Sequence, residues 1–245
     1  MKRNKLFILL VAVIIAGLAA GPAMAAPAPE YHFATIKSIK NKSGLTCTVR
    51  IKTDRIRKYY IYKQTGQKGD YKFLRDHGCS TCALATVLNS IGGYSYTPAR
   101  LHKKIIPAKL GKKYTMPIKL YGLHKILQKY GIYSKFVPRF TKKQAKKEIT
   151  DWLKRGGIVI VTVKSGSDHR WTRHHHSFIL LGLKKNGDVI VGDSAKDNYQ
   201  GNRRIKTAKM KDILRYMIPC TSKKYTYCWP GTSTAGGYIL TGDVE

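Results

Sequence analysis

Acidic residues are scarce in this sequence. Its 245 residues include 13 Asp and Glu against 46 Lys and Arg, which gives a formal net charge of +33. Such an excess predicts attraction to anionic polymers such as wall teichoic acids, phospholipid surfaces, acidic peptides or nucleic acid. The basic residues are spread along the whole chain, and no nucleic-acid-binding motif occurs. We therefore expect no nucleic-acid partner. Two interpretations of the charge remain of equal weight: binding to an anionic cell-wall polymer, and a solvated basic surface without a specific partner.

Long apolar runs are also lacking, apart from one near the N-terminus. This run, Leu6–Ala20, follows three basic residues and precedes an Ala-Met-Ala site at residues 23–25. The run is too short to span a membrane without strain. Basic residues, an apolar run and a small-residue cleavage site follow one another in the order typical of a secretory signal peptide. We expect residues 1–25 to be a signal peptide that is removed near Ala26, leaving 30 of the 33 net positive charges. The mature protein would then be secreted or cell-wall associated in a bacterium, with no stable membrane span after cleavage.

No internal repeat or low-complexity segment interrupts the chain. Its length fits one ordinary domain with additions, or at most two small ones, and suffices for a sizeable core without metals or disulfides. Residues 26–58 are predicted to be an N-terminal extension with short strands, and residues 59–245 a single domain.

Hydrophobic periodicity predicts helices first and an antiparallel sheet afterwards. Helices are expected at residues 79–91, 97–106, 117–130 and 141–156, and near 208–217. A run of apolar residues at 158–163 predicts a strand buried on both faces, and strands at 177–182 and 189–191 flank an Asn-Gly turn, with a last strand at 237–240. This order is typical of the α+β class.

Five cysteines are an odd number for an exported protein, so at least one has no partner within the monomer. If Cys79 is a thiol, Cys47, Cys82, Cys220 and Cys228 remain, and the last two flank a short loop that a disulfide would close. A reducing habitat would leave all five as thiols, so the pairing stays open.

Cys79 stands at the start of a helix whose apolar face predicts burial. Ser80 and Thr81 are expected to cap its first turn and Gly92-Gly93 to end it. The unpaired N–H groups and the dipole at a helix start favour a thiolate, which is the nucleophile of cysteine chemistry. The alternative is a small buried cysteine with no chemical role.

A base and an acid lie far downstream of this cysteine. His176 precedes one strand of the predicted hairpin and Asp193 follows the other, so antiparallel pairing brings them together. A carboxylate beside an imidazole fixes its tautomer and stabilises the imidazolium that can activate a thiol. As alternatives, His174–His176 can be the polar start of a strand, and Asp193 can be a turn residue, both without a chemical role.

These residues carry a family resemblance. Gly78-Cys79 followed by Ala-Leu-Ala-Thr-Val-Leu-Asn, then His176-Ser-Phe-Ile-Leu-Leu-Gly, then Val-Gly-Asp193 resembles the papain-like cysteine peptidases. The nearest branch is that of the bacteriocin-processing, double-glycine leader peptidases and their secreted stand-alone relatives, over about residues 60–195. The resemblance implies a papain-like fold for residues 59–245 and cleavage of peptide or isopeptide bonds in a peptide or protein substrate through a thioester, without a cofactor. Cys79 would be the nucleophile, His176 the base and Asp193 the orienting acid.

The sequence also departs from the family pattern. Ser80-Thr81 replaces Gly-Pro after the nucleophile, and Ser194 replaces Pro after the acid. The family places an oxyanion-stabilising Gln before the Cys, but Phe73 occupies the expected position. Gln64, in Tyr-Lys-Gln, resembles the Y-x-Q of secreted relatives and is the candidate donor alongside the Cys79 backbone N–H. No ATP-binding cassette occurs in the chain.

Other classes of site compete with this interpretation. Cys79 and Cys82 form a C-x-x-C at a helix start, as in thiol-disulfide oxidoreductases, although the segment before it is a poor strand. A second C-x-x-C for zinc is lacking, and His174–His176 with Asp168 or His169 makes a poor metal site because consecutive strand residues point to opposite faces. No metal or cofactor is therefore expected. A catalytically silent, basic wall-binding module is the third class.

Overall fold

The computed structural model describes residues 34–41, 44–51, 56–64, 72–110, 118, 120–164, 171–172, 175–195, 204–220 and 236–242. The predicted signal peptide, residues 1–25, lies outside these ranges. The strands are β1 Ala34–Asn41, β2 Gly44–Ile51, β3 Ile56–Tyr62, β4 Ser134–Val137, β5 Ile158–Lys164, β6 His175–Leu183, β7 Asp188–Gly192, β8 Ile205–Lys209 and β9 Tyr238–Thr241. The helices are α1 Lys72–His77, α2 Cys79–Ser90, α3 Pro98–Arg100, η1 Leu101–Ile105, α4 Ile106–Leu110, α5 Leu120–Lys129, α6 Lys142–Lys154 and α7 Met210–Tyr216.

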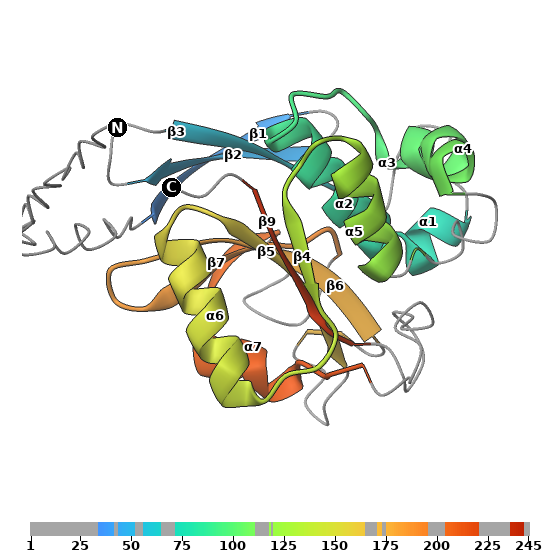
Figure 1. Cartoon of the computed structure of the whole chain (residues 1–245). Coiled ribbons are helices and arrows are strands. Elements are labelled where there is room, and N and C mark those ends of the chain that lie inside the picture. The colour runs from blue at the N-terminus through green and yellow to red at the C-terminus, as the bar shows by residue number, and fades with distance from the viewer. Residues whose placement is uncertain are drawn as a thin grey trace, which may run out of the picture.

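The described strands form two antiparallel sheets. Strands β1, β2 and β3 pair in chain order, and the larger sheet has the order β4-β9-β5-β6-β7-β8. Every pairing in the larger sheet is antiparallel. Figure 1 shows α2 and α5 on one side of this sheet, and α6 and α7 on the other. The molecule is therefore an α+β protein, as the sequence predicts.

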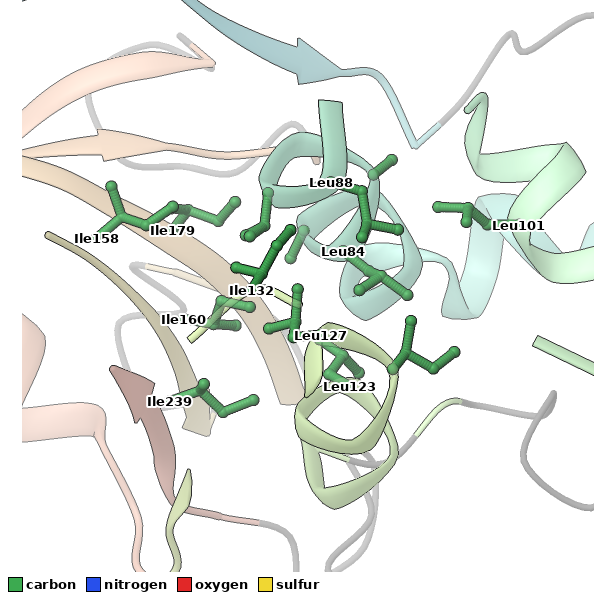
Figure 2. Close-up of a cluster of buried hydrophobic side chains, with 14 of the residues drawn as sticks. Leu84, Leu88, Leu101, Leu123, Leu127, Ile132, Ile158, Ile160, Ile179 and Ile239 are labelled. Atoms are coloured by element: carbon green, nitrogen blue, oxygen red, sulfur yellow. The ribbon is translucent and has the colours of Figure 1, made fainter. Parts of the chain in front are cut away.

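Strand β5 lies in the middle of the larger sheet and is buried on both faces, as its apolar run predicts. Ile158 and Ile160 pack toward α2 and α5, while the alternate residues Val159 and Val161 pack toward α6 and α7. Figure 2 shows the first of these cores, in which leucines of α2 and α5 meet isoleucines of the sheet. The packing fixes α2 against the sheet.

Two helix starts follow the expected capping chemistry. Thr97 accepts from the Arg100 backbone N–H before Pro98, and Thr141 forms a capping box with Gln144. The cap predicted for α2 is wrong, because Gly78 is its N-cap without a side-chain bond and Ser80 lies inside the helix.

Two short strands escaped the sequence analysis. Strands β4 and β8 form the two edges of the larger sheet, and β8 includes Ala208, where the sequence predicts a helix. No helix within the described ranges is long and apolar enough to span a membrane.

Candidate active site

Helix α2 carries Cys79 at its first residue, next to the sheet. The helix is buried along almost its whole length, and the Cys79 side chain is itself buried. Gly78 joins α1 to α2 at close range, since its N–H donates to the Leu74 carbonyl at 2.8 Å. A Cβ on Gly78 would lie 2.3 Å from that carbonyl oxygen, so only glycine fits at this junction. The nucleophile candidate thus sits on a rigid element.

The β6–β7 hairpin brings His176 and Asp193 into contact. Ile179 pairs with Gly192, so the same register places Asp193 opposite Phe178, with His176 two residues away on that face. His176 Nε2 and Asp193 Oδ1 are 2.6 Å apart, and both side chains are buried. The predicted proximity of these two residues is confirmed.

The Cys79 thiol and the His176 ring are close enough for each to shift the pKa of the other. Burial raises the pKa of the thiol, but the hydrogen bond and charge of His176 and the Ser177 backbone N–H outweigh it, so the pKa lies below the ordinary value of 9.0. Since Asp193 occupies Nε2, the other ring nitrogen, Nδ1, is left for Cys79.

The charge of the imidazole is stabilised in the same way. Burial lowers the pKa of His176, but the carboxylate of Asp193, by its charge and its hydrogen bond, and the thiol of Cys79 raise it to about 10. A thiol with a lowered pKa and an imidazole with a raised pKa favour a thiolate–imidazolium pair. Such a pair is a prepared nucleophile together with a proton donor.

Asp193 is held by more groups than the sequence suggested. Its Oδ2 accepts from Lys206 Nζ at 3.2 Å, and its Oδ1 also accepts from the Ala195 N–H at 2.9 Å. Its own N–H donates to the Arg204 carbonyl at 2.7 Å. Sequence reasoning missed Lys206 and Arg204, because a basic residue on or next to a short strand gives no sign that it is buried.

Gln64 is fixed beside the segment that precedes Cys79. Its Nε2 donates to the Arg75 carbonyl at 2.7 Å, and its Oε1 accepts from Ser194 Oγ at 3.4 Å. Its backbone N–H donates to the Ser194 carbonyl at 2.8 Å. Gln64 is therefore tied both to α1 and to the turn that follows Asp193, while its role as an oxyanion donor stays a prediction.

A row of buried hydroxyl groups links α2 to the sheet. Ser80 Oγ lies 3.9 Å from Cys79 Sγ and donates to Ser177 Oγ at 3.3 Å. Ser177 Oγ in turn lies 3.1 Å from Thr162 Oγ1 on β5. Ser80 thus joins the start of α2 to β6 and β5.

The described cysteine side chains include two thiols and one disulfide-bonded residue. Cys79 and Cys82 are both thiols, and Cys82 Sγ lies 3.9 Å from the Lys63 carbonyl oxygen. Cys220 is disulfide-bonded, so the alternative in which all five cysteines are thiols does not describe this structure. The side chains of Cys47 and Cys228 lie outside the described part of the chain.

Metal binding finds no additional support. No group of three or more His, Cys, Asp or Glu side chains is placed to hold a metal ion within the described ranges. Residues 168, 169 and 174, which belong to the metal alternative, lie outside those ranges. Of the residues in the metal alternative, the structure describes His175 and His176, and His176 is hydrogen-bonded to Asp193.

Comparison with known proteins adds no relative. The chain matches no model of a known protein family, and no curated protein is detectably similar to it. What the site can do therefore follows from its own geometry and charges.

Proposed function

We propose that this protein is a thiol hydrolase that cleaves peptide or isopeptide bonds, with a papain-like fold and with Cys79, His176 and Asp193 as its catalytic triad. One observation carries the proposal. A buried imidazole is bound to a buried carboxylate at 2.6 Å and contacts a thiol that stands at the start of a buried helix. Three separate segments of the chain contribute to this arrangement, and each residue has the contact that its role requires.

The reaction follows from the two charges. The Cys79 thiolate attacks the carbonyl carbon of the scissile bond, and the imidazolium of His176 gives its proton to the leaving amine as the C–N bond breaks. The resulting thioester is then attacked by water, whose proton returns to His176, and the thiolate leaves. Asp193 holds the imidazole in the required tautomer throughout.

The developing oxyanion needs hydrogen-bond donors. The Cys79 backbone N–H, at the first turn of α2, has no acceptor within the helix, and it is our first donor. Gln64 is the second, because its amide is held by Arg75 and Ser194 close to the segment leading into Cys79.

The two alternative classes make different demands on these residues. A thiol-disulfide oxidoreductase needs Cys79 and Cys82 to exchange electrons and has no use for an acid behind His176. The His176–Asp193 pair therefore favours the hydrolase. A silent wall-binding module has no need of either pair.

Export and wall association complete the proposal. The sequence of residues 1–25 supports secretion, and N-terminal sequencing of secreted protein should begin near Ala26. A secreted protein that still began at Met1 would contradict this part of the proposal. The basic composition supports an anionic wall polymer as partner.

The central test is chemical labelling combined with hydrolysis. Mature protein is treated with a low concentration of iodoacetamide or of an electrophilic peptide, and the adduct is located by mass mapping. We expect the adduct on Cys79 and not on Cys82, together with loss of hydrolysis of a peptide library or of purified cross-linked wall. Equal labelling of both cysteines, or no release of product from any substrate, would argue against the hydrolase.

A further inference from the structure

Asp193 lies between two basic side chains, and the reaction described above uses only one of them. Oδ1 faces His176 Nε2 at 2.6 Å, whereas Oδ2 accepts from Lys206 Nζ at 3.2 Å. The side chains of Asp193 and Lys206 are both 0% exposed. The carboxylate is thus held at both oxygens, away from water.

The sheet register explains this arrangement. Asp193 follows β7, and the Arg204 carbonyl opposite it on the β8 side accepts its N–H. Lys206 pairs with Val191, two residues before Asp193, so its side chain is on the same face as the carboxylate. His176, Asp193 and Lys206 therefore form a row across three neighbouring strands.

Aromatic rings complete the surroundings of this row. Lys206 Nζ lies 5.6 Å from the centre of the Trp171 ring, and Trp171 stacks on Phe178 at 4.7 Å. Phe178 lies 5.9 Å from the His176 ring. A buried carboxylate in such a place needs a charged partner with a hydrogen bond to each oxygen.

Building on the proposed hydrolase, we propose that Lys206 is a positioning residue of the triad, which holds Asp193 Oδ2 so that Oδ1 stays directed at His176. The alternative role for Lys206 is that of a counter-charge alone. The two roles predict opposite effects of removing the Lys206 charge on the stability of the Cys79 thiolate. If only a cation is removed near the imidazole, the imidazolium becomes more stable and the Cys79 thiolate with it. If the carboxylate instead loses its orientation, the imidazolium is weakened and the thiolate becomes less stable.

The test is the pH dependence of alkylation of Cys79 by iodoacetamide, which follows the thiolate and requires no substrate. In Lys206→Met, we expect alkylation at neutral pH to slow by about tenfold to a hundredfold, as is common for residues that orient a reacting group. The midpoint pH should move up toward 9.0, the ordinary value of a thiol. Lys209→Met, on the exposed end of the same strand, is the matched control and should leave the midpoint unchanged.

A double-mutant cycle shows whether Lys206 acts through Asp193. Asp193→Asn alone should raise the midpoint, and adding Lys206→Met should then change it little, because the carboxylate is already gone. Additive shifts would overturn the proposal, as would a midpoint in Lys206→Met that is unchanged or lower than in the wild type.

Folding is checked by thermal unfolding of each variant. Should Lys206→Met not fold, NMR of wild-type protein with ¹⁵N-labelled lysine still tests the contact. We expect one Nζ resonance that exchanges slowly with water and shifts in Asp193→Asn, and a spectrum without such a change would overturn the proposal. If alkylation behaves as expected but no hydrolysis is found, the role of Lys206 stands and the proposed hydrolase is wrong.

Discussion

At the scale of the residue, Cys79 and Cys82 have the same chemistry but different neighbours. Cys79 contacts His176, whereas Cys82 lies near the Lys63 carbonyl. We expect Cys79→Ala and His176→Ala to lower hydrolysis by several orders of magnitude, as in other triads. Cys82→Ser is the control and should keep most activity, at a cost of about 1–3 kcal/mol in stability because a hydroxyl replaces a buried thiol. Equal sensitivity to Cys79 and Cys82, with tolerance at His176, would favour the oxidoreductase.

The pH dependence of hydrolysis is a second prediction at this scale. The active form needs a thiolate, which is present above the lowered pKa of Cys79, and an imidazolium, which is lost as the pH rises through about 10. Activity should therefore rise on the acid side at a pH below 9.0 and fall near pH 10. In Asp193→Asn the alkaline fall should move to lower pH, because the carboxylate that raises the pKa of His176 is gone. Initial rates across the pH range measure both limbs, and an alkaline limb unaffected by Asp193→Asn would contradict the assignment of Asp193.

Part of the site could be predicted from residues alone. His176 and Asp193 lie on either side of an Asn-Gly turn, which predicts that the two strand ends approach each other. The turn does not predict the register shift between Leu180 and Gly182, which places Asp193 on the same face as His176. The burial of Lys206 could not be predicted, because a lysine in a short strand reads as exposed. On β8, Lys206 and Ala208 point to the buried face of the strand, and the carboxylate of Asp193 accounts for a lysine at such a position.

At the scale of the element, the join between α1 and α2 sets the position of Cys79. A Cβ on Gly78 would lie 2.3 Å from the Leu74 carbonyl oxygen, so Gly78→Ala must shift the start of α2. We expect this variant to slow alkylation of Cys79 because the thiol moves away from His176. The rate of iodoacetamide labelling at neutral pH measures the effect.

A second glycine separates this effect from a loss of stability. Gly93 has φ +69 and no atom within 4 Å of an added Cβ, so Gly93→Ala strains the backbone without displacing a neighbour. It should cost about 1 kcal/mol in stability and leave the labelling of Cys79 unchanged. If both variants slowed labelling in proportion to their loss of stability, Gly78 would have no special role in positioning.

The elements themselves were predictable where their signals are local. The capping box of Thr141 and Gln144 lies within four residues, and the structure confirms it. Strand β4 has four residues, and β9, its partner, lies a hundred residues later in the chain, so no short window of sequence contains their pairing. The α2 cap failed for another reason: Ser80 binds Ser177 on the sheet, and tertiary contact outweighed local capping.

At the scale of the whole molecule, surface charge and site charge should respond differently to salt. Exposed lysines such as Lys142, Lys143 and Lys146 on α6 face solvent, whereas Cys79, His176 and Asp193 are buried. Salt screens exposed charges over about 8 Å at physiological ionic strength and about 30 Å at 0.01 M, but screens buried pairs much less. Adsorption to anionic wall polymer should therefore fall sharply between these conditions, while the alkylation rate of Cys79 stays nearly constant.

Adsorption is measured by co-sedimentation with purified wall, before and after removal of its anionic polymer. The alkylation rate of Cys79 is measured by iodoacetamide labelling in the same buffers. Wall stripped of its polymer is the control and should bind weakly at every salt concentration. Adsorption that is indifferent to salt would mean that the partner is recognised by shape rather than by charge. A labelling rate that fell together with adsorption would mean that the Cys79–His176 pair depends on the exposed charges, which its burial argues against.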